Sequence, residues 1–141
     1  MQLTSRRLFC ATLCQAVACA AAADARQDAA LPIVRGQVEG ERVTVRVAST
    51  ALAEAGGRAR VASTTGAFLV ARTGERAFVA LTGTCSHESC QITDADAEAY
   101  ICPCHESKFN AKGSVLRGPA ELPLQEYATA FADGVLTISL T

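Results

Sequence analysis

The residues best suited to metal chemistry are concentrated in one short stretch of the chain. The 141-residue sequence has seven cysteines but only two histidines. Both histidines and the four cysteines beyond residue 25 lie in two similar runs, Cys85-Ser86-His87-Glu88-Ser89-Cys90 and Cys102-Pro103-Cys104-His105-Glu106-Ser107. Thiolate and imidazole are the protein ligands of zinc and of iron–sulfur sites. Two loops that present them at matched spacing therefore predict a metal centre.

The number of donors narrows the type of metal site. Six donors are too many for one tetrahedral zinc, which takes four. They divide into four ligands and a remaining pair. A structural zinc module without a redox role stays open as an alternative, because thiolate and imidazole also hold zinc.

The pattern Cys-x-His-x-x-Cys followed by Cys-x-Cys-His-x-Ser resembles the Rieske [2Fe–2S] family, strongly over residues 82–124 and weakly in the flanking sequence. It is most similar to the high-potential branch of cytochrome bc-type complexes and arsenite oxidase small subunits. The resemblance implies one cluster per chain, with Cys85 and Cys102 on one iron and the imidazoles of His87 and His105 on the other. It also implies a disulfide between Cys90 and Cys104, which low-potential oxygenase ferredoxins lack.

The resemblance assigns roles to residues around the cluster as well. Ser107 matches a serine that donates a hydrogen bond to a bridging sulfide and raises the potential. Phe109 stands where many high-potential members have a tyrosine that hydrogen-bonds a ligand cysteine. Phenylalanine has no donor, so we expect Phe109 to serve only as apolar cover. Gly118 and Pro119 resemble the proline-containing loop that covers the cluster.

Three residues depart from the pattern of quinol-oxidising members. Glu88 and Ser89 replace an apolar residue and a glycine, and Glu106 replaces another frequent glycine. Glycine at such places often marks a positive φ or a close approach, so these changes bear on the loop backbone. Negative charge disfavours the reduced cluster, so we expect a potential below that of quinol-oxidising relatives.

The first twenty-five residues differ in composition from the rest. Two arginines precede an apolar, alanine-rich stretch over residues 8–23, which predicts an export signal or N-terminal anchor at 1–25 and a linker at 26–30. The run Ser5-Arg6-Arg7-Leu8-Phe9 resembles a twin-arginine signal, which implies export of a folded protein. Cleavage, lipidation at Cys19 and retention as an anchor all remain open. We expect a periplasmic location or one on the outer face of the cytoplasmic membrane, where disulfides persist.

Residues 31–141 predict one all-β Rieske-type domain, a small antiparallel barrel or sandwich with two cluster-binding loops. Alternating or apolar runs predict strands near 42–47, 58–61, 67–71 and 77–81. A hairpin is expected from 124–131 and 135–140 around an Asp-Gly turn. Residues 51–55 predict one helical turn, and a largely loop-like region follows residue 81.

These features favour an exported one-electron carrier or oxidoreductase subunit without a substrate pocket of its own. The near balance of 13 basic and 14 acidic residues argues against nucleic acid as a partner. Expected partners are a quinol-oxidising cytochrome b/c-type complex or a molybdenum oxidase subunit, although the acidic Glu88 weakens the quinol interpretation. A ferredoxin component of an oxygenase is the alternative, with membrane association through the N-terminus left open.

Overall fold

The computed structural model describes residues 29–141. The expected export signal, and the linker up to residue 28, lie outside this part. The described residues form fourteen short strands arranged in three sheets. The described residues form no helix that is long and apolar enough to cross a membrane. The prediction of an all-β fold is confirmed.

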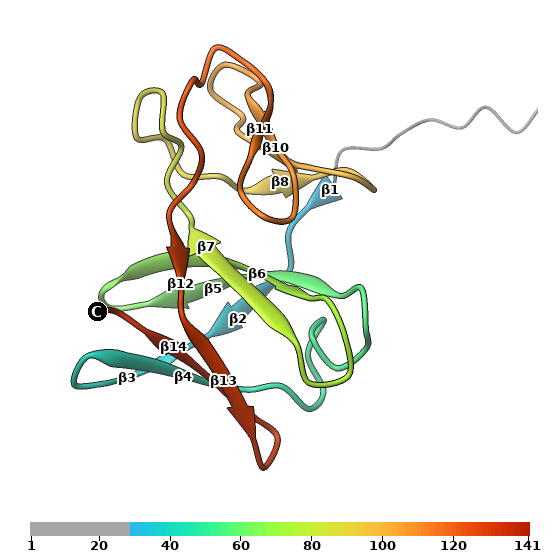
Figure 1. Cartoon of the computed structure of the whole chain (residues 1–141), viewed down its shortest axis with the longest axis vertical. Coiled ribbons are helices and arrows are strands. Elements are labelled where there is room, and N and C mark those ends of the chain that lie inside the picture. Colours follow the sequence, from blue (N-terminus) through green and yellow to red (C-terminus); the bar gives the residue numbers. More distant parts are fainter. Residues whose placement is uncertain (1–28) are drawn as a thin grey trace, which may run out of the picture.

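Two of the sheets pack together as an open sandwich at one end of the molecule, without closing into a barrel (Figure 1). In β4, Val43 and Val45 are buried while Arg42 and Arg46 are exposed, as expected for a strand with one face on a core. Valines, leucines and phenylalanines from both sheets fill that core. In spatial order, the strands of one sheet are β12 (Glu126–Tyr127), β7 (Phe78–Thr82), β6 (Gly66–Arg72), β5 (Arg58–Ser63) and β2 (Ile33–Arg35). Those of the other sheet are β13 (Thr129–Ala132), β14 (Val135–Ser139), β4 (Arg42–Arg46) and β3 (Gln37–Glu39).

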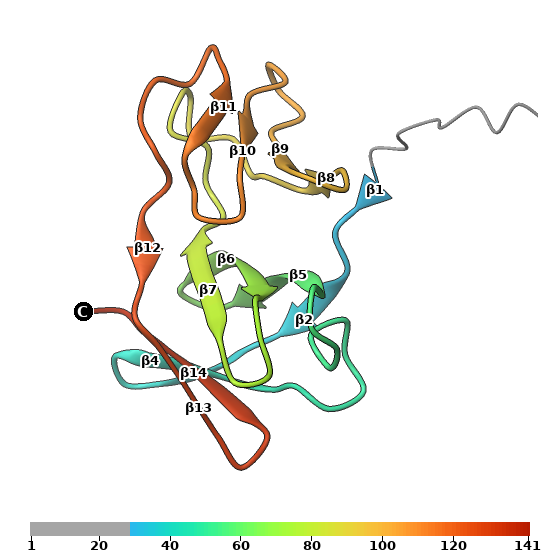
Figure 2. The same ribbon diagram turned by 45° about the vertical axis from the view of Figure 1, so that its right-hand side comes forward.

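The third sheet stands above the sandwich and carries the two cysteine-rich loops (Figures 1 and 2). It has its own apolar core, which includes Tyr100, Phe109, Cys85 and Cys102. Its strands are short, and the loops between them are held by many backbone hydrogen bonds. In spatial order they are β1 (Ala29–Ala30), β8 (Asp94–Ala95), β9 (Tyr100–Ile101), β10 (Lys108–Phe109) and β11 (Val115–Arg117).

The predicted closing hairpin is present, and its turn has the chemistry that the sequence indicates. β13 pairs with β14 antiparallel. Asp133 and Gly134 between them both have positive φ, 53° and 74°. This is the left-handed pair that a two-residue hairpin turn requires.

Three local details differ from expectation. Residues 51–55 form turns rather than a helical turn, because the carbonyls of Leu52 and Ala53 accept hydrogen bonds from the Arg72 guanidinium. β2 pairs with β5 in parallel, which the long connection over residues 36–57 allows. Ala29–Ala30, expected in the linker, form a strand that pairs with β8.

Candidate metal centre

The two cysteine-rich loops have the same backbone hydrogen-bond pattern. In each, the N–H of the first cysteine donates to a carbonyl five residues later. The N–H of the residue four positions after that cysteine donates back to the cysteine's own carbonyl, and all four bonds measure 2.7–3.0 Å. The residues involved are Cys85, Ser89 and Cys90 in the first loop and Cys102, Glu106 and Ser107 in the second.

This shared geometry turns the chain sharply at one equivalent residue in each loop. Ser89 has φ of 58° and Glu106 has φ of 60°. For a residue with a Cβ atom, the left-handed region costs roughly 1–2 kcal/mol. The loop conformation is therefore retained despite the missing glycines, with strain at both positions.

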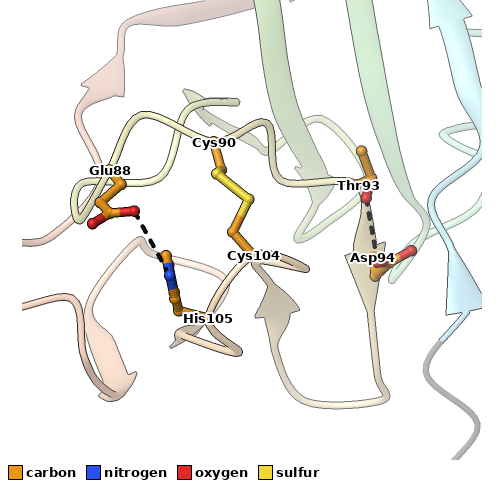
Figure 3. The surroundings of a disulfide bond; sticks show 6 residues. All are labelled: Glu88, Cys90, Thr93, Asp94, Cys104 and His105. Carbon is orange, nitrogen blue, oxygen red and sulfur yellow. Dashed lines mark hydrogen bonds and ion pairs between the residues drawn. A yellow bond between two sulfur atoms is a disulfide. The ribbon is translucent and has the colours of Figure 1, made fainter.

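A disulfide joins the two loops, as predicted. The sulfurs of Cys90 and Cys104 are 2.06 Å apart, and their Cα atoms are separated by 6.5 Å (Figure 3). The bond ties the loop between β7 and β8 to the loop between β9 and β10, fourteen residues further along the chain. It thereby fixes how the loops face each other.

The other two cysteines of the described residues are free thiols buried between the loops. Cys85 is 3% exposed and Cys102 is 1% exposed. Burial raises the pKa of the Cys102 thiol, and the neighbouring Cys85 thiol raises it further, while the backbone N–H groups of Cys104 and His105 lower it. These N–H groups are thus placed to stabilise a thiolate on Cys102.

The two imidazoles lie together at the exposed tip. The rings of His87 and His105 are 4.9 Å apart between centroids and nearly perpendicular, at 89°. Glu88 reaches across from the first loop, and its carboxylate Oε2 lies 3.7 Å from His105 Nε2 (Figure 3). The tip therefore carries a carboxylate beside one imidazole edge.

A third segment, after β11, is held against both loops. The backbone N–H of Ala120 donates to the buried Ser107 Oγ at 3.0 Å. The Ser86 hydroxyl donates to the carbonyl of Leu122 at 2.6 Å. Gly118 and Pro119 lie in this segment, and Pro119 lines a hollow beside His87. Ser86 was not singled out from the sequence, since a serine hydroxyl has no distinctive spacing.

Two aromatic residues form the apolar floor behind the thiols. Phe109 and Tyr100 face each other across β10 and β9, and both are fully buried. The Tyr100 hydroxyl has no hydrogen-bond partner among the described residues. Burial raises the pKa of Tyr100 to about 12, against an opposing effect of Arg58. The floor therefore stays uncharged.

An ionic network supports the turn that leads into the second loop. Lys108 Nζ donates to the Asp96 carboxylate at 2.9 Å, and Asp96 also accepts from the N–H groups of Glu98 and Ala99. The hydrogen bond from Lys108 is the largest of the effects that lower the pKa of Asp96 to about 2. Arg58, on β5 of the sandwich, donates to the carbonyls of Asp96 and Ala97. The network therefore links the upper sheet to the sandwich.

These donors fit a cluster with mixed ligation. Two thiols are buried, and that of Cys102 faces backbone N–H groups, whereas two imidazoles are exposed and adjacent. Sulfur inside and imidazole outside is the division that a Rieske centre needs, because its cysteines and histidines serve different irons. The Ser107 hydroxyl oxygen accepts a hydrogen bond from the Ala120 N–H, so the hydroxyl proton of Ser107 remains free to donate. The fold and this donor set define a small iron–sulfur domain.

The family follows from comparison with known sequences. The model for the Rieske [2Fe-2S] domain matches residues 34–128. The chain belongs to the Rieske [2Fe-2S] domain family, whose members bind a [2Fe–2S] cluster.

Similar proteins include two curated relatives. The chain is 37% identical over 97 residues to cytochrome b6-f complex iron-sulfur subunit 1 of Synechocystis, covering 65% of this chain and 54% of that protein. It is 34% identical over 62 residues to the cytochrome b6-f complex iron-sulfur subunit of Chlorobaculum tepidum, covering 43% and 34%. The matches thus span about a third to a half of these relatives.

Solved structures agree on the fold. A cyanobacterial plasma membrane Rieske protein from Synechocystis superposes with a TM-score of 0.52 at 31% identity, covering 58% of this chain and 85% of that one. The ferredoxin of carbazole 1,9a-dioxygenase from Nocardioides aromaticivorans gives a TM-score of 0.54 at 22% identity, covering 70% and 98%. The second likeness concerns the fold alone.

Proposed function

We propose that this protein is an exported one-electron carrier, or the electron-transfer subunit of a larger oxidoreductase. In this proposal Cys85 and Cys102 hold one iron of a [2Fe–2S] cluster, and His87 and His105 hold the other. The observation that carries it is the meeting of two loops of identical backbone geometry, with buried thiols and exposed imidazoles. The Cys90–Cys104 disulfide suits an exported protein, because an oxidising compartment preserves it.

The chain's own residues have distinct tasks at such a site. When bound, the cluster supplies reversible one-electron chemistry, at a higher potential than all-cysteine ligation gives. Buried Cys85 and Cys102 keep water away from the sulfur ligands, and the N–H groups of Cys104 and His105 stabilise negative charge on Cys102. The exposed edge of His87 offers the short path to a partner. The Ser107 hydroxyl is placed to donate toward a sulfide and so favour the reduced state.

Partner and location follow from the relatives and from the export segment. Relatives named as subunits of cytochrome b6-f complexes support a cytochrome b/c-type membrane complex as the site of action. The neighbour named as a plasma membrane Rieske protein supports the outer face of the cytoplasmic membrane. A molybdenum oxidase subunit is the other partner class that we propose. Quinol is the less favoured substrate, because Glu88 places a carboxylate beside His105 Nε2.

A second candidate is a ferredoxin component of an oxygenase system. The shared fold with the carbazole 1,9a-dioxygenase ferredoxin supports it. The disulfide between the loops argues against it, since low-potential oxygenase ferredoxins lack that pair. Midpoint potential separates the two, because high-potential Rieske centres reach up to about +300 mV, whereas the low end of the range is about −150 mV.

The proposal is tested by purifying the protein and measuring iron, acid-labile sulfide and zinc together with the visible spectrum. We expect two irons, two sulfides and visible bands that bleach on one-electron reduction. Cys85→Ser and His87→Ala should abolish these bands. Glu39→Gln, a change on β3 far from the loops, is the matched control and should keep them. A colourless protein that holds one zinc would overturn the proposal.

A further inference from the structure

Two arginines of β5 face the upper sheet from the sandwich. Arg58 and Arg60 alternate along the strand with the buried residues Ala59 and Val61, which belong to the core of the sandwich. Successive side chains of a strand point to opposite faces, so both arginines lie on the face away from that core. The strands β5, β6 and β7 lie between the upper sheet and the other sheet of the sandwich (Figures 1 and 2).

The neighbouring strands show what covers this face. Leu69 of β6 is the cross-strand partner of Arg60, and Leu81 of β7 is the partner of Leu69. Residues directly opposite each other project from the same face of a sheet. Both leucines are fully buried in the apolar core of the upper sheet, which also contains Cys85 and Cys102. The two arginines therefore lie at the border between the sandwich and that core.

Arg58 contacts the segment that leads into the second cysteine-rich loop. It donates to the carbonyls of Asp96 and Ala97 at 3.1 and 2.9 Å. Its Cζ atom lies over the Tyr100 ring, 5.4 Å from the ring centre. Tyr100 precedes Cys102 by two residues and is buried in the same core. A positive charge thus lies against the aromatic floor behind the buried thiols.

Arg60 contacts the base of the first cysteine-rich loop. It donates to Gln91 Oε1 at 2.8 Å, and Gln91 directly follows Cys90 of the disulfide. Gln91 also forms a backbone bridge with Thr84, the residue before Cys85. The Nε atom of Arg60 is buried and has no hydrogen-bond partner among the described residues. This guanidinium therefore contacts the point where the first loop ends, with part of its charge removed from water.

Neither arginine has an acidic partner in the part of the chain that the structure describes. Their hydrogen bonds go to neutral oxygens, and the ion pairs of these residues join His105 with Glu88 and Lys108 with Asp96. A half-buried charge without a counter-ion is costly. A cluster held by the buried thiols gains one negative charge on reduction, and this charge can compensate the two guanidinium groups.

We propose that Arg58 and Arg60 raise the reduction potential of the cluster by supplying positive charge from the sandwich side. The inference rests on the proposed one-electron function and adds two residues outside the loops that determine its potential. Both are positioning residues, because Arg58 acts through the Tyr100 floor and Arg60 through the base of the first loop. Their charge acts across an apolar core, where the effective dielectric is lower than in water.

The test separates charge from hydrogen bonding at one position. Arg58→Gln removes the charge but can still donate to a carbonyl, whereas Arg58→Lys keeps the charge but loses the planar fork. The midpoint potential of each cluster-loaded protein is measured by redox titration, in which the cluster gains one electron while dithionite is oxidised. Iron and sulfide content and the midpoint of thermal unfolding are measured on the same samples.

We expect Arg58→Gln to lower the equilibrium constant for reduction by about three- to tenfold, the range of one unit charge in partly desolvated surroundings. This corresponds to about 30–60 mV for one electron, since a tenfold change is about 59 mV. Arg60→Gln should act in the same direction, and Arg58→Lys should keep most of the original potential. Arg42→Gln removes a charge from the exposed end of β4 in the far sheet and should leave the potential nearly unchanged.

The outcomes distinguish this inference from the function on which it rests. Equal shifts in Arg58→Gln and Arg58→Lys would show that hydrogen bonding acts instead of charge, and would overturn the inference. An unchanged potential in both glutamine variants, or an equal shift in Arg42→Gln, would overturn it too. If Arg58→Gln does not fold, Arg60→Gln and Arg60→Lys give the same comparison. An unaltered protein that takes up no iron and sulfide would instead overturn the proposed function before any potential is measured.

Discussion

Glu106 and Ser89 occupy equivalent strained positions, so replacing either with glycine should stabilise the loops. Both residues have a left-handed backbone, with φ of 60° and 58°, and both donate their N–H to the carbonyl of a free cysteine. Glycine adopts this conformation without a Cβ penalty. The hydrogen bonds are made by the main chain, so Glu106→Gly and Ser89→Gly keep them.

The size of the effect follows from two opposing contributions. Relief of the left-handed strain returns about 1–2 kcal/mol. The greater conformational entropy of glycine in the unfolded chain lowers the free energy of unfolding by about 0.4–1 kcal/mol. A net gain of roughly 0.5–1 kcal/mol per site corresponds to a rise of about 2–5 °C in the midpoint of thermal unfolding for a domain of this size.

The assay is thermal unfolding of the cluster-loaded protein, followed by circular dichroism and by loss of the visible bands. Glu106→Gln is the control, because it removes the charge but keeps the Cβ atom. We expect both glycine variants to raise the midpoint and Glu106→Gln to leave it nearly unchanged. Equal gains from Glu106→Gln and Glu106→Gly would refute the strain argument and point to charge instead.

Three further predictions concern the same site. Glu88→Gln should raise the reduction potential by about 45 mV, the effect of one carboxylate at about 8 Å and an effective dielectric of about 40, measured by redox titration; an unchanged or lower value contradicts it. Ser107→Ala leaves the Ala120 N–H without its partner and should lower stability by about 1–3 kcal/mol, together with a lower potential, whereas Ser107→Thr should retain part of both. The pKa of Asp96 is lowered from 3.8 to about 2, so its ion pair with Lys108 stabilises the folded state fully at pH values above about 4. This contribution is lost as the pH falls toward 2. Unfolding midpoints of Asp96→Asn should therefore be less sensitive to pH in this window, and an unaltered acid transition would exclude the ion pair as its cause.

The loops and the closing hairpin were predictable because their signals are local. Asp133-Gly134 sets a turn through its own backbone preferences, and the cysteine and histidine spacing is contained within each loop. The same holds for the strand β4, whose alternation of arginine and valine is visible in the sequence.

Features that depend on contacts distant in the chain were not visible in the sequence. The failure of residues 51–55 to form a helical turn depends on Arg72, which takes two of the carbonyls there. The hollow beside His87 requires Glu121 and Leu122 to come from a segment more than thirty residues away. The hydrogen bond from Ser86 to Leu122 spans the same separation. The resemblance at Gly118 and Pro119 implies that this segment covers the cluster, but no periodicity or motif indicates the contacts of Arg72, Ser86, Glu121 and Leu122.

The most direct test of mixed ligation is pulsed electron paramagnetic resonance of the reduced protein labelled with ¹⁵N-histidine. Ligation by His87 and His105 predicts an average g value below that of the free electron and couplings from two histidine nitrogens. Loss of one of the two couplings in His105→Cys would assign that coupling to His105. A reduced cluster that shows no coupling to histidine nitrogen would contradict the central claim.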